Sequence, residues 1–295
     1  MHITPAWCEE QFGTQLRAFA ADLHSHPELS FEETRTTQKI LQALQSLPGV
    51  EVLATGAKTG AVARLAGGEG PAVALRADID AIPQHEAVQR PDASVYEGKM
   101  HACGHDTHTA SLLGAAMALC RRKSALRGDV YFVFQPAEEA LSGAKYLVEQ
   151  CGLFQAIHPA AMFGLHNYPE LPLGTVGVKQ GQLMSYKDVF EMRFVGRSGH
   201  SSMPQKNIDP IVAAAAFIQS VQTITSRNVG PLEAAVVSIC QVHAGTPRNL
   251  VVDDVLLSGN IRTLDEAVRE RVLQRFEQIA RVSSDTIYDN DNPLD

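Results

Sequence analysis

The first 170 residues alternate between two hydrophobic periodicities. Apolar residues that recur every three to four positions predict amphipathic helices, whereas short apolar runs bounded by glycine or polar residues predict buried strands. The predicted helices cover residues 7–23, 109–120 and 140–150, and a fourth follows a capping box at 30–33 and ends near residue 47. The predicted strands cover residues 50–53, 61–65, 72–77, 130–135 and 160–166. This alternation predicts an α/β sheet covered by helices on both faces.

The pattern changes near residue 185, where the strands become half-exposed and the element order changes. The predicted elements are a strand at 189–195, a helix that opens at Asp209-Pro210, strands at 235–243 and 254–262, and a helix that follows a capping box at 263–266. The order β-α-β-β-α resembles a split βαβ, ferredoxin-like sandwich. We therefore expect a mixed-sheet domain over residues 1–181 and an inserted α+β domain over residues 182–295.

Composition and charge narrow the class of protein. Hydrophobic residues make up 45% and charged residues 20% of the 295 residues, as in ordinary soluble globular proteins. The net charge is −8 without any cluster of Lys and Arg, so we expect no nucleic-acid partner. No apolar run approaches the roughly 20 residues of a transmembrane helix, so we expect no membrane association. The five scattered cysteines and the lack of a signal-peptide pattern favour the reducing cytoplasm.

The candidate chemistry starts from the segment MHACGHDTHT, which places Cys103 and His105 two positions apart. Thiolate and imidazole are favoured ligands of zinc and related metals, and in an extended loop these two side chains would point the same way. Three further segments end apolar runs with residues of metal-binding type, namely RADID (76–80), QPAEE (135–139) and GLHN (164–167). Ligands bind beyond the carboxyl ends of strands in open α/β sheets. The four segments together therefore predict one metal-dependent active site.

The pair Glu138 and Glu139 predicts hydrolysis. Adjacent residues of an extended backbone point in opposite directions, so one carboxylate could bind metal while the other takes a proton from a water molecule. The spacing alone allows either order. His108 follows His105 by three positions, and it either shares the metal-binding face or supports the site from behind.

Each of these features also has a structural explanation. A single Cys or His beside a strand is usually structural, an adjacent glutamate pair is usually a solvated surface feature, and a DxD pair can belong to a turn. The joint occurrence of all four segments favours a metal site. A purely structural zinc site fits less well, because Glu138 and the DxD pair would have no role in it.

Six motifs carry a resemblance to a known family: LHSHPELSFEE, LRADIDAIP, HACGHDTHTA, QPAEE, GLHN and GHSSMP. In this order, over about residues 23–282, they resemble the amidohydrolase branch of the dinuclear metallopeptidases. This branch includes hippurate hydrolase, N-acyl-amino-acid amidohydrolases and indole-3-acetyl-amino-acid hydrolases. The resemblance implies metal-dependent hydrolysis of the amide bond of N-acyl or N-aroyl amino acids, which releases a carboxylic acid and a free amino acid.

The resemblance also implies roles for particular residues. Two divalent ions (Zn, Mn, Co or Ni) would be held by Cys103, His105, Glu139 and His166. Glu138 would be the general base and then the acid toward the leaving amine. Asp80 would support the site as a carboxylate, with Asp78 a weaker candidate of the same kind. The second domain would act as a lid and mediate homodimerisation, with His200 and Asn249 as substrate-binding residues.

The chain departs from the family's pattern after the second domain. In the family the catalytic domain returns there and supplies a final histidine ligand, which residues 283–295 do not resemble. We therefore expect an uncovered apolar face and sheet edge. An alternative function follows, in which the chain is an inactive truncated remnant that dimerises or binds ligand without catalysis.

Overall fold

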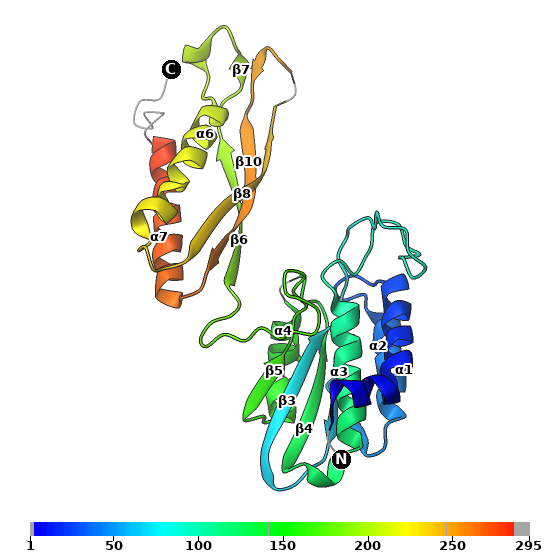
Figure 1. The fold of residues 1–295 in the computed structure, drawn as a ribbon. Coiled ribbons are helices and arrows are strands. Elements are labelled where there is room, and N and C mark those ends of the chain that lie inside the picture. Colours follow the sequence, from blue (N-terminus) through cyan, green and yellow to red (C-terminus); the bar gives the residue numbers. More distant parts are fainter. Residues whose placement is uncertain (1–2, 141, 246, 286–295) are drawn as a thin grey trace. The chain divides into compact units, whose positions relative to one another are not determined.

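The computed structural model describes residues 3–140, 142–245 and 247–285 (Figure 1). The residues after 285, which belong to the segment that departs from the family's pattern, lie outside the described residues. The chain divides into two compact units, Met1–Leu173 and Gly174–Asp295. Each unit has a sheet and a hydrophobic core of its own. The division falls a few residues before the expected boundary at residue 181.

The first unit is built on a five-stranded mixed sheet in the order β1-β2-β4-β3-β5. The strands are β1 (Val50–Leu53), β2 (Ala61–Leu65), β3 (Gly70–Asp78), β4 (Gly128–Gln135) and β5 (Ala161–Gly164). β3 runs parallel to β4 and β5, whereas β2 is antiparallel to β1 and β4. The carboxyl ends of three neighbouring strands therefore meet at one end of the sheet. The mixed α/β architecture expected from the sequence is confirmed.

Helices cover both faces of this sheet (Figure 1). The long helices α1 (Pro5–Ser25), α2 (Thr34–Gln45) and α3 (His105–Cys120) lie on one face. Phe132 and Phe134 of β4 are fully buried beneath them. The other face is covered by the segment that contains α4 (Gly143–Lys145), a π-helical turn (Tyr146–Gln150) and α5 (Leu153–Ala156). A single 3₁₀ turn, Lys123–Ala125, connects α3 to β4.

The capping box predicted at Ser30 is wrong. Helix α2 begins only at Thr34, and its first free amides, those of Arg35 and Thr36, donate to the Glu28 carboxylate at 3.0 and 2.8 Å. The Ser30 hydroxyl instead donates to Asp80. A carboxylate satisfies unpaired amides at a helix start as well as a hydroxyl does, and it also suits the positive end of the helix dipole. Because Glu28 lies further before these amides than the three-residue spacing of a capping box, that pattern could not reveal it.

Strand β5 lies at the edge of the sheet, whereas the parallel strands β3 and β4 each have a neighbouring strand on both sides. All four of its residues are exposed, including Met162 (41%) and Phe163 (57%). Among the described residues its only strand neighbour is β3. The expected uncovered apolar edge is therefore present at β5.

The second unit is an α+β layer structure. Strands β6 (Tyr186–Val195), β10 (Asp254–Thr263) and β8 (Ala235–Ala244) form an antiparallel sheet in that order. Helices α6 (Pro210–Val221) and α7 (Glu266–Asp285) pack on it around the fully buried Phe217. The Asp209 side chain caps α6 by accepting from the amide of Ile211, as the Asp-Pro pair predicts.

Smaller elements complete this unit. They are the short strands β7 (Gly199–His200) and β9 (Leu250–Val251), which pair with each other, a 3₁₀ turn (Pro204–Lys206) and a π-helical turn (Ile224–Asn228). In the described part of the chain, no helix has both the length and the apolar character needed to cross a bilayer.

The position of the α2 cap can be tested by substitution. We expect Glu28→Ala to lower the free energy of unfolding by about 1 kcal/mol and to speed amide exchange at Arg35 and Thr36, because both amides lose their acceptor. Urea unfolding followed through Trp7, the only tryptophan, reports on this unit. Ser30→Ala should leave exchange at both amides unchanged. Faster exchange in Ser30→Ala alone would support the capping box instead.

Candidate metal centre

The predicted site residues of the first unit meet at the carboxyl ends of the three parallel strands. β3 is followed by Asp80, β4 by Glu138 and Glu139, and β5 by His166, while His105 begins helix α3. The topology thus brings segments that are far apart in the sequence to one end of the sheet.

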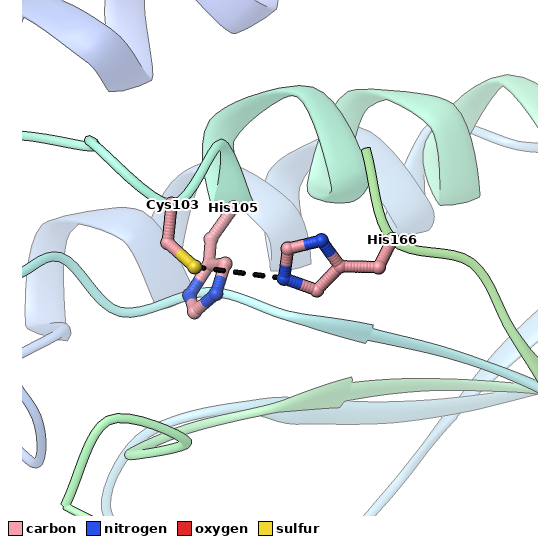
Figure 2. Close-up of side chains that lie close together, drawn as sticks. All are labelled: Cys103, His105 and His166. Carbon is pink, nitrogen blue, oxygen red and sulfur yellow. Dashed lines mark hydrogen bonds between the residues drawn. The ribbon is translucent and has the colours of Figure 1, made fainter. Parts of the chain in front are cut away.

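Three overlapping groups of side chains could hold a metal ion, and two of them contain the predicted ligands. In each of these two groups the candidate ligand atoms lie within 4.8 Å of one another: Cys103, His105 and His166 in one, and His105, Glu138 and Glu139 in the other. Figure 2 shows the first group, in which the Cys103 sulfur lies 3.5 Å from Nε2 of His166. His105 is fully buried and belongs to both groups, whereas His166 is exposed.

The surroundings of His105 fix which of its nitrogens could bind a metal. Its Nδ1 lies 2.8 Å from the main-chain oxygen of Asp80 and 3.3 Å from that residue's carboxylate, so it carries the hydrogen and donates. Its Nε2 is buried and has no hydrogen-bond partner among the described residues. A buried imidazole nitrogen without a partner costs free energy, and a metal ion would satisfy it. The residues present therefore fit a bound cation.

The charge of the site favours a cation as well. Burial lowers the pKa of His105, but Asp80, Asp78 and Glu139 outweigh this effect and raise it above its usual value. Burial and the neighbouring Glu139 raise the pKa of Cys103 to about 12. Burial and Glu139 also raise the pKa of Glu138. In all three cases neighbouring carboxylates contribute to the shift, and a divalent ion would neutralise part of their negative charge.

Asp80 connects the two groups. Its Oδ2 accepts from the amide of Glu139 at 2.9 Å and from the Ser30 hydroxyl at 2.7 Å, while its other oxygen faces His105. Burial raises the pKa of Asp80, but the hydrogen bonds from His105 and Ser30 outweigh it and lower the pKa. Asp80 therefore stays ionised and orients a candidate ligand of each kind, imidazole and carboxylate.

His108 has partners for both of its nitrogens. Nδ1 lies 2.6 Å from the carboxylate of Asp78, and Nε2 accepts from the amide of Asn167 at 2.9 Å. Asp78, His105 and His108 also lie within 4.8 Å of one another, but this group is fully buried and His108 has no free nitrogen. The geometry thus favours the supporting role of His108, which holds Asn167 and so the loop that carries His166.

The extended backbone expected around Cys103–His105 and Glu138–Glu139 is wrong, although the side chains of each pair do come together. Cys103 and His105 are not aligned by an extended loop, because Gly104 between them is left-handed with φ 81°. Glu138 and Glu139 lie in a turn, and their carboxylates both approach His105 instead of pointing apart. Glycine makes the first geometry possible, since it adopts positive φ freely.

A buried polar cluster around Asp106, the residue after His105, was not predicted from the sequence. His24 of α1 lies 2.8 Å from Asp106 through Nδ1 and 3.1 Å from Glu86 through Nε2. Asp106 raises the pKa of His24. His101 is also buried, with both ring nitrogens unpartnered among the described residues, and burial lowers its pKa to about 4. Asp106 stands within the HACGHDTHT motif, which was the available signal for this cluster.

His200 and Asn249 belong to the second unit, whereas the metal-binding groups lie wholly in the first. Nδ1 of His200 lies 2.8 Å from the Ser202 hydroxyl and accepts from the amide of the same residue at 3.2 Å. The amide of Ser201 donates to the main-chain oxygen of Asn249 at 3.1 Å. The pairing of β7 and β9 thus brings the two predicted substrate-binding residues close together in the second unit.

Known proteins resemble this chain in sequence and in structure. The family described as Peptidase family M20/M25/M40 matches residues 74–283. N-acetylcysteine deacetylase of Bacillus subtilis (strain 168) is 45% identical over 274 residues, which cover 92% of this chain and 71% of that protein. N-acyl-L-amino acid amidohydrolase of Geobacillus stearothermophilus is 39% identical over 273 residues, 92% of this chain and 73% of the relative.

A solved structure shows the same fold. The YXEP protein of Bacillus subtilis, described as a dinuclear metal binding peptidase, aligns with a TM-score of 0.77 and 40% identity. The alignment covers 95% of this chain and 72% of that one. The chain thus spans about three quarters of the length of this protein and somewhat less of some sequence relatives.

Removing the shared imidazole should affect both metal-binding groups. We expect His105→Ala to lower the metal content from about two ions per chain to one or none, because both groups lose a ligand. Elemental analysis of the folded protein measures this, and His158→Ala, which removes an exposed histidine, serves as control. Two ions retained in His105→Ala would contradict the assignment.

Metal affinity should rise with pH. The Cys103 pKa of about 12 means that the metal-free thiol is protonated near neutral pH, so a cation that binds the thiolate must displace a proton. Each displaced proton strengthens apparent affinity about tenfold per pH unit below the pKa. Competition titrations between pH 7 and 8.5 measure the slope, which should fall by about one proton in Cys103→Ala. An unchanged slope in this variant would show that the thiol does not bind metal.

Proposed function

This chain belongs to peptidase family M20/M25/M40, and from this premise we propose that it hydrolyses the amide bond of N-acyl or N-aroyl amino acids using two divalent metal ions. The products would be a carboxylic acid and a free amino acid. The names of the relatives support this substrate class, since they describe hydrolysis of N-acyl amino acids. The observation that carries the proposal is the convergence of two metal-binding groups on His105.

We assign the ions to Cys103, His105, Glu139 and His166. Bound there, they would supply positive charge that polarises the amide carbonyl and acidifies a water molecule. The mixture of one thiol with imidazoles and carboxylates suits Zn, Mn, Co or Ni. Asp80 keeps the His105 ring in the tautomer whose Nε2 is free to bind, and it holds the main chain of Glu139. Both effects orient ligands without direct contact with the ion.

We assign Glu138 as the general base that takes a proton from water and returns it to the leaving amine. Its side chain is half-buried, and burial together with Glu139 raises its pKa toward the range in which a carboxylate exchanges protons efficiently. The assignment of Glu138 as base and Glu139 as ligand follows the family resemblance. The geometry is compatible with it, because both carboxylates approach His105.

In the second unit we assign His200 and Asn249 to substrate binding. Since Nδ1 of His200 accepts from the amide of Ser202, Nε2 carries the ring hydrogen, and this exposed residue can donate it to a substrate oxygen. We assign this unit, residues 182–295 in the expectation above, to a lid and homodimer interface, and residues 1–181 to the catalytic domain. The free cysteines among the described residues fit the cytoplasm.

The proposal can be tested by hydrolysis assays. We expect the protein of residues 1–295, loaded with Zn, Mn, Co or Ni, to hydrolyse hippurate or an N-acetyl amino acid, with release of the amine measured directly. Glu138→Ala should lower kcat by about 10²- to 10⁴-fold, because proton transfer loses its base. Its metal content should not change.

Glu149→Ala, which removes an exposed carboxylate of the same unit, is the matched control and should retain activity. Full metal loading without turnover on any substrate of the panel would favour the alternative, a protein that dimerises or binds ligand without catalysis.

A further inference from the structure

The loop between α1 and α2 contacts both acidic loops of the metal centre, although it offers no candidate metal ligand. Leu29 pairs with Ala81 in an isolated parallel bridge, and Ser30 donates to Asp80 at 2.7 Å. Three residues further, Oε1 of Glu33 accepts from the amide of Ala137 at 2.7 Å. The loop therefore holds the segment after β3 and the segment after β4 at the same time.

Glu33 is an unusual residue for a purely structural role. It is completely buried, and its second oxygen, Oε2, has no hydrogen-bond partner among the described residues. Although it precedes α2, its side chain makes no capping bond to that helix. Burying a carboxyl group costs free energy, which nearby main-chain amides and the Thr59 side chain offset only in part, so its contact with Ala137 calls for an explanation. Burial raises the pKa of Glu33, which favours its neutral form.

Ala137, whose amide donates to Glu33, directly precedes Glu138, the proposed base. Ala137 has φ 50°, a left-handed conformation that non-glycine residues adopt rarely. It is fully buried, and its carbonyl accepts from the amide of Gly143 at 3.0 Å. Such a conformation persists only where surrounding contacts enforce it. Without Glu33, the buried amide of Ala137 would lose its acceptor and the backbone would relax.

The backbone on both sides of Glu138 is thus fixed by buried carboxyl groups. Glu33 holds the amide of Ala137, and Asp80 holds the amide of Glu139. We propose that Glu33 is a positioning residue that directs the Glu138 side chain by keeping Ala137 left-handed. This inference rests on the proposed function, in which Glu138 is the general base. Glu33 itself exchanges no proton with the substrate.

Three variants of the metal-loaded chain of residues 1–295 test the inference. Glu33→Ala removes the acceptor, Glu33→Gln keeps an acceptor oxygen of the same length in neutral form, and Glu28→Ala removes a carboxylate of the same loop that binds only α2 amides. We expect Glu33→Ala to lower kcat about 10- to 100-fold with KM changed less than about threefold, because the base is misplaced and not removed. Glu33→Gln should restore most of kcat, and Glu28→Ala should leave it unchanged.

A second readout does not depend on activity. Hydrogen exchange followed by mass spectrometry should show faster exchange, by about tenfold or more, in peptides that cover residues 136–140 of Glu33→Ala. The same peptides should be unchanged in Glu33→Gln and Glu28→Ala. If the wild type proves inactive, this exchange pattern still supports the contact while the proposed function fails.

Two results would overturn the inference. One is unchanged exchange at residues 136–140 in Glu33→Ala. The other, in an active enzyme, is a loss of kcat that Glu28→Ala reproduces or that Glu33→Gln does not restore, since it would indicate a general loss of stability.

Discussion

The buried carboxylate of Asp80 contacts three segments that are distant in sequence. One oxygen faces the ring of His105 at the start of α3, and the other accepts from Glu139 after β4 and from Ser30 before α2. With only one of these partners, the buried carboxylate of Asp80 would have an oxygen lone pair or its negative charge left unsatisfied. Together they keep the carboxylate ionised and fix the segments around it. The geometry of the metal centre therefore depends on a residue that need not touch the metal.

Part of this arrangement follows from sequence. Cys103, Glu139 and His166 each stand next to an apolar run or the start of an apolar helix, and parallel strands bring such positions together by topology. The supporting contacts follow no local pattern. Ser30 and Asp80 are 50 positions apart, and Glu33 and Ala137 are 104 apart. Periodicity describes neighbours along an element, so it predicts which elements form and cannot predict which loops touch.

The same limit explains the wrong capping box and the question that the sequence left open about His108. The capping box at Ser30 matched a valid local pattern, but a tertiary contact with Asp80 takes its hydroxyl. The role of His108 depended on whether its ring nitrogens were free, and that is decided by Asp78 and by the loop after β5. The surrounding structure also holds the two candidate histidine ligands to different degrees. His105 lies in the packed interior, whereas His166 follows an edge strand whose side chains are exposed.

Gly104 limits how this centre could be altered. A methyl group at that position would lie 2.4 Å from the side-chain amide of Asn167, and the left-handed backbone already disfavours any other residue. Gly104 thus sets the geometry between the Cys103 thiol and the His105 imidazole and takes no part in the chemistry. Directed evolution toward another metal could vary the donors on either side, but replacing this glycine would strain the backbone and displace the Asn167 side chain. The donors of this loop are therefore easier to exchange than the residue that spaces them.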